Sequence, residues 1–176
     1  MAVAQEPIQS WNKRIPSDKH ELAVLHSIAN WIPGEHQIRP SQENLEAKAI
    51  EMMNVESYYV STEDYIYDLV FSFKTKMEPS GKLYAVVPTL EELLYPNGLL
   101  KANQYPYQLN EGSFHSVIWY SHGRPEEDSK INTDIETGLR LELSHSNFEF
   151  VWYENPKMTV PGIYHAQVFW HTTTPP

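Results

Sequence analysis

The sequence predicts an α+β fold in which N-terminal helices pack on a mostly antiparallel C-terminal sheet. In the first half, apolar residues recur every three or four positions between serine, proline and glycine boundaries, which is typical of amphipathic helices. Beyond residue 113, three segments rich in β-branched and aromatic residues are typical of strands. The length of 176 residues suits one domain. We therefore expect an extended arm at 1–16, a single α+β domain at 17–171 and a frayed tail at 172–176.

Three helices are predicted before residue 80. The first spans 17–32, because a serine is available as N-cap and a proline-glycine pair stops the run. The second begins at Ser41, directly after a proline. The third spans 61–77, because Ser61 and Asp64 have the spacing of a capping box and the apolar period continues to the end of that range.

The rest of the chain is predicted to contain four strands and one longer helix. The helix spans 131–143, where Ile131, Ile135, Leu139 and Leu143 recur every four residues. Residues 89–95 are expected to form one or two helical turns. The predicted strands are 83–87, 114–121, 148–153 and 164–171.

The composition excludes several classes of function. The 23 acidic residues outnumber the 13 basic ones, and a net charge of −10 repels phosphate backbones, so we expect no nucleic-acid partner. The absence of cysteine removes disulfides and thiolate chemistry and is compatible with the reducing cytosol. No apolar run resembles a signal peptide or a membrane span, so we expect a cytoplasmic protein without a membrane partner. The seven glycines form no phosphate-binding loop, and no cofactor is expected.

The histidines concentrate near the C-terminus, where five of the eight fall in the last 62 residues. Alternate residues of a strand share a face, so His165 and Gln167 point one way on one predicted strand. His115 and Trp119 share a face on another. If these two strands pair, His115 and His165 converge.

Three interpretations of these histidines stay open. A metal would suit converging imidazoles, but compact His-x-His and His-Glu-x-x-His spacings are missing, so no metal site is predicted. His165 would alternatively act as a nucleophile or general base, with Gln167 holding a bound anion. In the third interpretation the histidines are structural and are hydrogen-bonded to backbone or water.

Aromatic side chains occupy adjacent positions on the same predicted strands, and Trp119 and Trp152 belong to this set. Neighbouring residues of a strand point to opposite faces, so a one-sided core cannot take all of them. Either the remaining aromatics line the rim of the sheet, or they form a pocket that stacks a sugar or a base. In the second case Trp119 and Trp152 are binding residues.

Four motifs follow one another in the C-terminal half: NQYPY at 103–107, FHSVIW at 114–119, FVWYEN at 150–155 and YHAQVF at 164–169. Together they resemble an uncharacterised eukaryotic and viral family that includes the fungal N-acetylglucosamine-induced proteins. The resemblance covers roughly residues 45–171 and carries no established activity. It places Tyr107, within the first motif, among the candidate binding residues. Gln167 stands where the family has a second histidine.

The segment His165-Ala166-Gln167 is also similar to the signature of the histidine-triad superfamily of nucleotide hydrolases and transferases. That resemblance implies a histidine-triad-like fold, with His165 as the nucleophile on a phosphate and Gln167 stabilising the bound group.

Two functions follow as hypotheses. The first is a ligand- or protein-binding regulatory module. The alternative is a small hydrolase or transferase acting on a nucleotide or a sugar phosphate, with His165 as its catalytic residue. In either case the expected small-molecule partner is a phosphorylated or sugar ligand. The candidate binding residues are His115, Trp119, Gln167, Trp152 and Tyr107.

Overall fold

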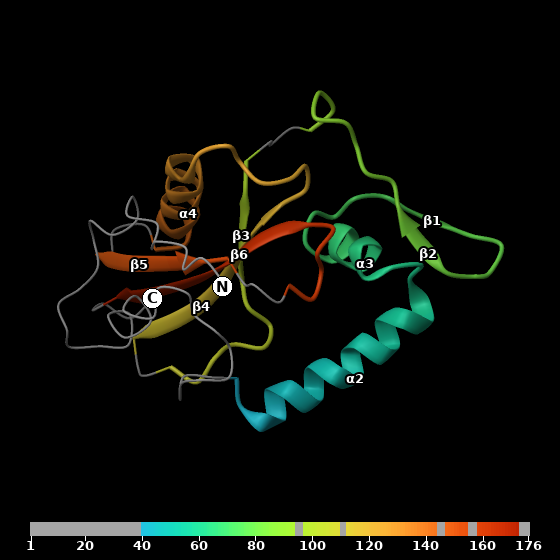
Figure 1. The fold of residues 1–176 in the computed structure, drawn as a ribbon, viewed down its shortest axis with the longest axis horizontal. Helices are drawn as coiled ribbons and strands as arrows, with labels where there is room; N and C mark the ends of the chain where they lie inside the picture. The colour runs from blue at the N-terminus through green and yellow to red at the C-terminus, as the bar shows by residue number, and fades with distance from the viewer. Residues whose placement is uncertain (1–39, 94–96, 110–111, 144–146, 155–157, 173–176) are drawn as a thin grey trace, which may run out of the picture.

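The computed structural model describes residues 40–93, 97–109, 112–143, 147–154 and 158–172. The predicted arm at 1–16 and the predicted helix at 17–32 lie outside the described residues. The described chain forms helices and two antiparallel sheets, which confirms the α+β class (Figure 1). In chain order its elements are α2 (Gln42–Tyr58), α3 (Thr62–Leu69), β1 (Thr75–Met77), β2 (Leu83–Ala85), β3 (Leu99–Ala102), β4 (Ser113–Tyr120), α4 (Asp128–Leu143), β5 (Phe148–Tyr153) and β6 (Tyr164–Thr172).

The larger sheet has the strand order β3-β4-β6-β5, and each pair of neighbours is antiparallel. β4 and β6 form its centre, and their register places His115 opposite Phe169 and Trp119 opposite His165. β3 was not among the predicted strands. β6 continues to Thr172, a buried residue that the sequence had assigned to the tail.

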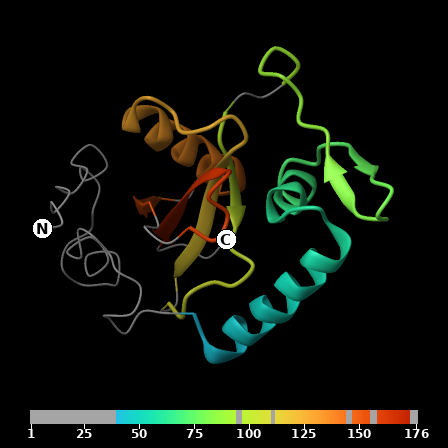
Figure 2. The same cartoon turned by 45° about the vertical axis from the view of Figure 1, so that its right-hand side comes forward.

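One face of this sheet, which we call the helix face, packs on α4 (Figure 2). Trp152 and Val168 on this face have no exposed surface. The predicted four-residue spacing in α4 is confirmed, because all four of its members are buried against the sheet. Burying such side chains contributes roughly 1.5–3 kcal/mol each. The helix face is therefore the main core of the described structure.

The opposite face, which we call the histidine face, carries His115, Val117 and Trp119 from β4 and His165, Gln167 and Phe169 from β6. α3 packs at one end of this face, where Ile66 meets Ile163 and Trp119. α2 and α3 contact each other, and α3 and α4 lie on opposite sides of the sheet (Figure 2). The predicted sharing of a face by these histidines and Gln167 is therefore confirmed.

The two helices near the histidine face begin as predicted. Ser41 accepts a hydrogen bond from the Asn44 N–H at 3.1 Å and caps α2. Ser61 accepts one from the Asp64 N–H at 3.1 Å and caps α3. Both serines satisfy a backbone donor that the first helical turn leaves without an intrahelical partner.

The predicted helix at 61–77 is wrong beyond Leu69. Ser72 has a φ of 55°, a left-handed conformation that an α-helix cannot continue through. The Phe73 N–H donates to the Tyr67 carbonyl at 3.1 Å, and the two rings stack at 5.7 Å. The next residues pair with β2 as strand β1. Pairing with a strand that comes later in the chain thus outweighs the local helical period.

Two smaller predictions also need correction. β2 ends at Ala85, short of the predicted 87. Within 89–95, the described residues form a turn instead of a helix, in which the Glu92 N–H donates to the Thr89 carbonyl at 3.1 Å. The Glu92 carboxylate accepts from the Thr89 N–H at 2.8 Å, so the turn is closed from both sides. Among the described helices, none has the length and apolar character needed to cross a bilayer.

Candidate functional site

A cavity of about 300 Å³ lies between the histidine face and the two helices that approach it. β4 and β6 contribute its floor, including Trp119, His165 and Gln167. α2 and α3 contribute its walls, together with residues 101–105 and 159–160. Three of the residues that the sequence singled out therefore meet in one concave space.

His165 reaches the cavity with one ring nitrogen already bonded. Its Nδ1 lies 2.8 Å from the Ile163 carbonyl oxygen, and a carbonyl can only accept, so Nδ1 carries the proton. In the neutral ring Nε2 therefore has a lone pair, and it has no hydrogen-bond partner among the described residues. The imidazole stacks on Trp119 with ring centroids 4.5 Å apart. His165 thus offers the cavity a hydrogen-bond acceptor or a nucleophile.

The protonation state of His165 is set mainly by burial, which lowers its pKa. The hydrogen bond to Ile163 acts in the opposite direction, whereas the nearby charge of Lys48 lowers the pKa further. Burial disfavours the charged ring because a low-dielectric site cannot solvate it. The neutral ring, with its lone pair on Nε2, is therefore the form present at neutral pH.

His115 lies on the same face as the cavity floor but does not line the cavity. The Tyr107 N–H donates to its Nδ1 at 3.2 Å, so the proton of the neutral ring sits on Nε2. That Nε2 lies 2.6 Å from the Gln167 Oε1. Burial lowers the pKa of His115 to about 4, and the hydrogen bond to Gln167 only partly opposes this shift. His115 therefore stays neutral and acts on the cavity through Gln167.

The two histidines share a face but do not form a common site. The pair formed by Val117 and Gln167 separates them along the β4–β6 ladder. Among the described residues, no group of three or more histidine, aspartate or glutamate side chains is arranged to hold a metal ion.

The remaining candidate residues lie outside the cavity wall. Tyr107 packs edge-on against the His115 ring at 4.7 Å, where it supports the histidine face. Trp152 lies on the helix face, fully buried, and its indole N–H donates to the Asn132 side chain at 3.0 Å. The structure thus groups Trp119, His165 and Gln167 in the cavity, with His115 beside Gln167 on the same face.

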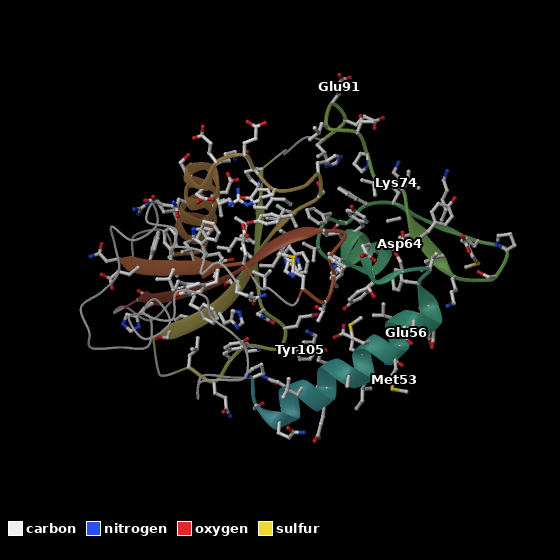
Figure 3. The ribbon with its side chains drawn as sticks, viewed as in Figure 1. Met53, Glu56, Asp64, Lys74, Glu91 and Tyr105 are labelled. Carbon is white, nitrogen blue, oxygen red and sulfur yellow. The ribbon has the colours of Figure 1, made fainter. Side chains whose placement is uncertain are left out.

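Sequence reasoning missed the acidic centre of the cavity wall. The Glu51 carboxylate on α2 accepts hydrogen bonds from the Tyr65 hydroxyl on α3 and from the Tyr105 hydroxyl, one on each oxygen. Tyr105 lies between the sheet and α2, whereas Met53 points outward from α2 (Figure 3). Burial and then Glu51 raise the pKa of Tyr105 to about 12. Tyr105 belongs to the NQYPY motif, but no local pattern indicates Glu51.

Two lysines complete the wall. Lys48 lies one turn before Glu51 on α2, and Lys101 lies on the edge strand β3. Neither ammonium group is hydrogen-bonded or ion-paired to another described residue. Glu51 is the one carboxylate among the described residues that line the cavity, so the two lysines leave this lining with a net positive charge.

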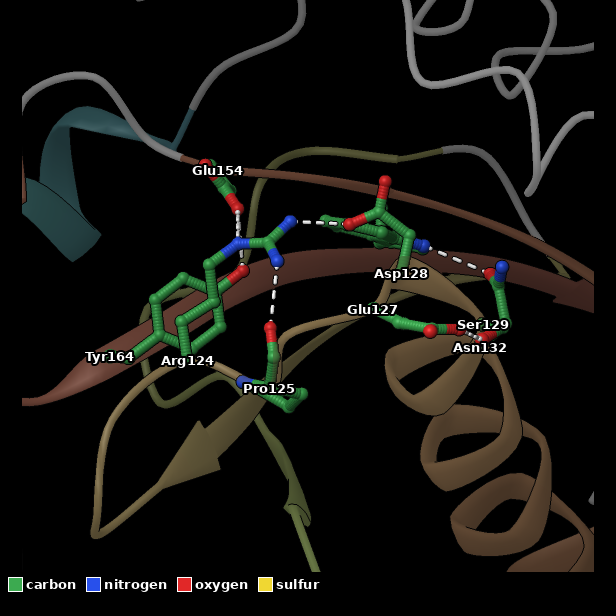
Figure 4. Close-up of polar contacts among 9 residues, drawn as sticks. Arg124, Pro125, Glu127, Asp128, Ser129, Asn132, Glu154 and Tyr164 are labelled. Atoms are coloured by element: carbon green, nitrogen blue, oxygen red, sulfur yellow. Dashed lines mark hydrogen bonds and ion pairs between the residues drawn. The ribbon is translucent and has the colours of Figure 1, made fainter.

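A second hollow lies beside the start of α4, but its two basic residues, Arg124 and Lys130, are already paired with carboxylates. The guanidinium of Arg124 donates to Glu154 at 2.7 Å, to the Pro125 carbonyl at 2.8 Å and to Asp128 (Figure 4). The Tyr164 hydroxyl donates to the same Glu154 oxygen at 2.7 Å. These contacts tie the loop after β4 to β5 and β6. We therefore regard this region as structural.

Comparisons with known proteins identify no family for this chain. No protein-family model matches it, and no curated protein does. One solved structure, described as "Crystal Structure of HTC1", is similar over 76% of this chain and 75% of its own, with 16% sequence identity and a TM-score of 0.44. A likeness at this level identifies neither a shared fold nor a shared activity. The resemblances to the N-acetylglucosamine-induced proteins and to the histidine-triad superfamily stay predictions.

Proposed function

We propose that the chain is a cytoplasmic binding module that holds a small ligand in the cavity on the histidine face. The observation that carries this proposal is the cavity itself, with Trp119, His165 and Gln167 on its floor. Ligand sites are typically concave, largely apolar and furnished with a few fixed polar groups. The Nε2 of His165 is such a group, because its partner nitrogen is held by Ile163.

A thermal-shift panel tests this proposal. The full chain is screened against nucleotides, sugars, sugar phosphates and sugar acids. A ligand that binds only the folded state stabilises it by about 2.7 kcal/mol at a hundredfold excess over Kd. We expect at least one compound to raise the Tm of the wild-type protein.

The matched variants locate the site. His165→Asn keeps an amide N–H that can donate to the Ile163 carbonyl and removes Nε2, so it should abolish the shift. His122→Asn replaces an exposed histidine outside the cavity and should leave the shift unchanged. A flat panel, or a shift that survives His165→Asn, would contradict the proposal.

We propose as a second candidate function that His165 catalyses phosphoryl transfer. The fixed tautomer supports it, because a neutral Nε2 with a lone pair is the form that attacks phosphorus. Nε2 would form an N–P bond while the P–O bond to the leaving group breaks, and the leaving oxygen would take a proton from water. A second water would then cleave the N–P bond, giving a free phosphate and the neutral imidazole.

Intact-mass spectrometry distinguishes the second candidate from simple binding. After incubation with sugar phosphates or nucleotides, a catalytic His165 should carry the mass of a phosphoryl or nucleotidyl group, and His165→Asn should not. Ligand binding without a covalent adduct and without product release would leave the binding module as the function.

A further inference from the structure

We infer that the cavity selects a small hydroxylated anion, and that Gln167 donates a hydrogen bond to the anionic group because His115 sets the orientation of the Gln167 amide. This inference rests on the proposed binding function and names the ligand class for the same site. His115 is then a positioning residue, and Gln167 is a specificity-determining one.

The orientation of Gln167 follows from a chain of donors and acceptors that begins at the backbone. The Tyr107 N–H can only donate, and it lies 3.2 Å from the Nδ1 of His115. Nε2 of the neutral ring must then carry the proton, and the group 2.6 Å away must accept it. Of the two polar atoms in the Gln167 side chain, only Oε1 can accept. The Asn103 amide nitrogen lies 3.3 Å from the same Nε2 and 3.5 Å from that oxygen. Because Nε2 carries the proton, this amide can donate only to Oε1.

This orientation leaves the Gln167 NH₂ group for the cavity. Gln167 is only half-buried and lines the cavity, whereas His115 is buried and does not line it. An NH₂ group has two donors and no acceptor, so it matches an oxygen with free lone pairs. A carboxylate or phosphate oxygen supplies such lone pairs, and hydrogen bonds to charged groups are the stronger ones.

His165 has the opposite polarity. Its Nε2 can only accept while the ring is neutral, so the matching ligand group is a hydroxyl that donates. The register of β4 and β6 holds both side chains on one face, two residues apart on β6. The ligand must therefore present an anionic oxygen and a hydroxyl at neighbouring positions.

The charge and the volume of the cavity restrict the class of ligand further. The cavity lining carries two lysines, Lys48 and Lys101, and one carboxylate, Glu51, so it is net positive in a chain with a net charge of −10. The volume of about 300 Å³ lies at the lower end of the range of roughly 300–1,000 Å³ for ligand pockets. A ligand of monosaccharide size matches this space better than a dinucleotide. A phosphate ester in a sugar phosphate and a carboxylate in a sugar acid both present such anionic oxygens, so both classes match the cavity.

Isothermal titration calorimetry of the full chain distinguishes the two classes of anionic ligand. The probes are hexose and pentose monophosphates, the corresponding sugar acids, the neutral sugars and inorganic phosphate. We expect a sugar phosphate or a sugar acid to bind at least about tenfold more tightly than its neutral sugar and than inorganic phosphate. Equal binding of the neutral sugar, or no binding by any hydroxylated anion, would overturn the inference.

Two variants of Gln167 test its role. Gln167→Glu keeps an acceptor for His115 and replaces the NH₂ group with a second oxygen, so it should lower the affinity for the anionic ligand by about tenfold or more. Gln167→Met removes the donor without adding charge and should also lower this affinity. Gln108→Glu adds the same charge at an exposed glutamine outside the cavity and should have no effect. Unchanged affinity in both Gln167 variants would contradict the assignment.

Nitrogen NMR tests the orientation without any ligand. Long-range ¹⁵N–¹H correlations should show the Nε2–H tautomer for His115 and the Nδ1–H tautomer for His165. The reverse tautomer at His115 would turn the Gln167 amide around and overturn the inference. Binding of neutral compounds that depends on His165 would leave the proposed function standing while the inference fails. A panel without any binder would contradict both.

Discussion

The two faces of the larger sheet are built from the same strands and have different tasks. On the helix face, α4 closes a continuous apolar core around Trp152 and Val168. On the histidine face, α2 and α3 leave a cavity whose floor includes His165 and Gln167. Because alternate residues of a strand point to opposite faces, one strand can supply core residues and site residues at the same time. The difference teaches that the residues that form the core and the residues that line the cavity alternate along β4 and β6, so each set can be changed separately.

The two histidines repeat this contrast on a smaller scale. Each stacks on the aromatic residue opposite it, His115 on Phe169 at 4.3 Å and His165 on Trp119 at 4.5 Å. In both rings Nδ1 meets a backbone group, but that group is an N–H donor at His115 and a carbonyl acceptor at His165. The two rings therefore stack in equivalent ways, but their backbone partners give them opposite tautomers and opposite hydrogen-bonding capacity.

The largest expected effect tests the separation of the two faces. Trp152→Ala should lower the free energy of unfolding by about 3–5 kcal/mol, because the side chain is fully buried and its removal leaves a cavity. Trp119→Ala should cost less, about 1–2 kcal/mol, because Trp119 already borders open space. Urea unfolding measures both. Equal losses would show that the histidine face carries as much of the stability as the helix face.

Acidification should lower the free energy of unfolding through His115 on the histidine face. The pKa of His115 is about 4 in the folded protein, below its ordinary value of 6.5, because the ring is buried. The unfolded chain therefore binds a proton over this range while the folded chain does not. The stability that neutral His115 provides is complete above pH 6.5, declines as the pH falls and is lost at about pH 4, with a total of order 3 kcal/mol.

Urea unfolding between pH 7.5 and pH 4.5 measures this effect by comparison with His115→Gln. The glutamine cannot take up a proton, although its amide can still donate to Gln167, so its stability should vary less with pH. His122→Gln, at an exposed position, should follow the wild-type curve. Parallel curves for wild type and His115→Gln would contradict the assigned burial of His115.

A smaller effect should come from the cavity wall. Glu51→Gln keeps one acceptor oxygen and presents an NH₂ group to the other phenol, which is left unsatisfied, so it should lower the free energy of unfolding by about 2 kcal/mol. The pKa of Tyr105, raised by burial and by Glu51, should fall from about 12 toward its ordinary value. Ultraviolet titration of the tyrosines measures this shift. Glu46→Gln, on the exposed side of α2, is the control.

The smallest effect concerns the start of α3. Ser61→Ala removes the oxygen that accepts from the Asp64 N–H and should cost about 1 kcal/mol. Ser61→Thr keeps the acceptor for the Asp64 N–H and the hydroxyl that donates to the Asp64 carboxylate, so it should restore most of the loss. Because α3 supplies part of the cavity wall, weakening its start should lower ligand affinity as well as stability. Unchanged stability would show that the cap is dispensable for holding α3 on the sheet.

Much of the fold could be predicted because its causes are local. The β5 boundaries and the buried positions of α4 follow from alternation and from four-residue spacing. The end of α3 could not, because β1 forms by pairing with β2, whose partner residues lie six to ten positions later in the chain. β3 was missed because it owes its strand conformation to pairing with β4.

The sequence by itself determined which residues of β4 and β6 share a face, because side-chain alternation is a property of each strand. It therefore grouped His165, Gln167, His115 and Trp119. Only the tertiary structure decided that His165 lines a cavity and that His115, on the same face, is buried beside it. Those outcomes depend on the register between the strands, on the backbone groups that meet each ring, and on the space that α2 and α3 leave uncovered.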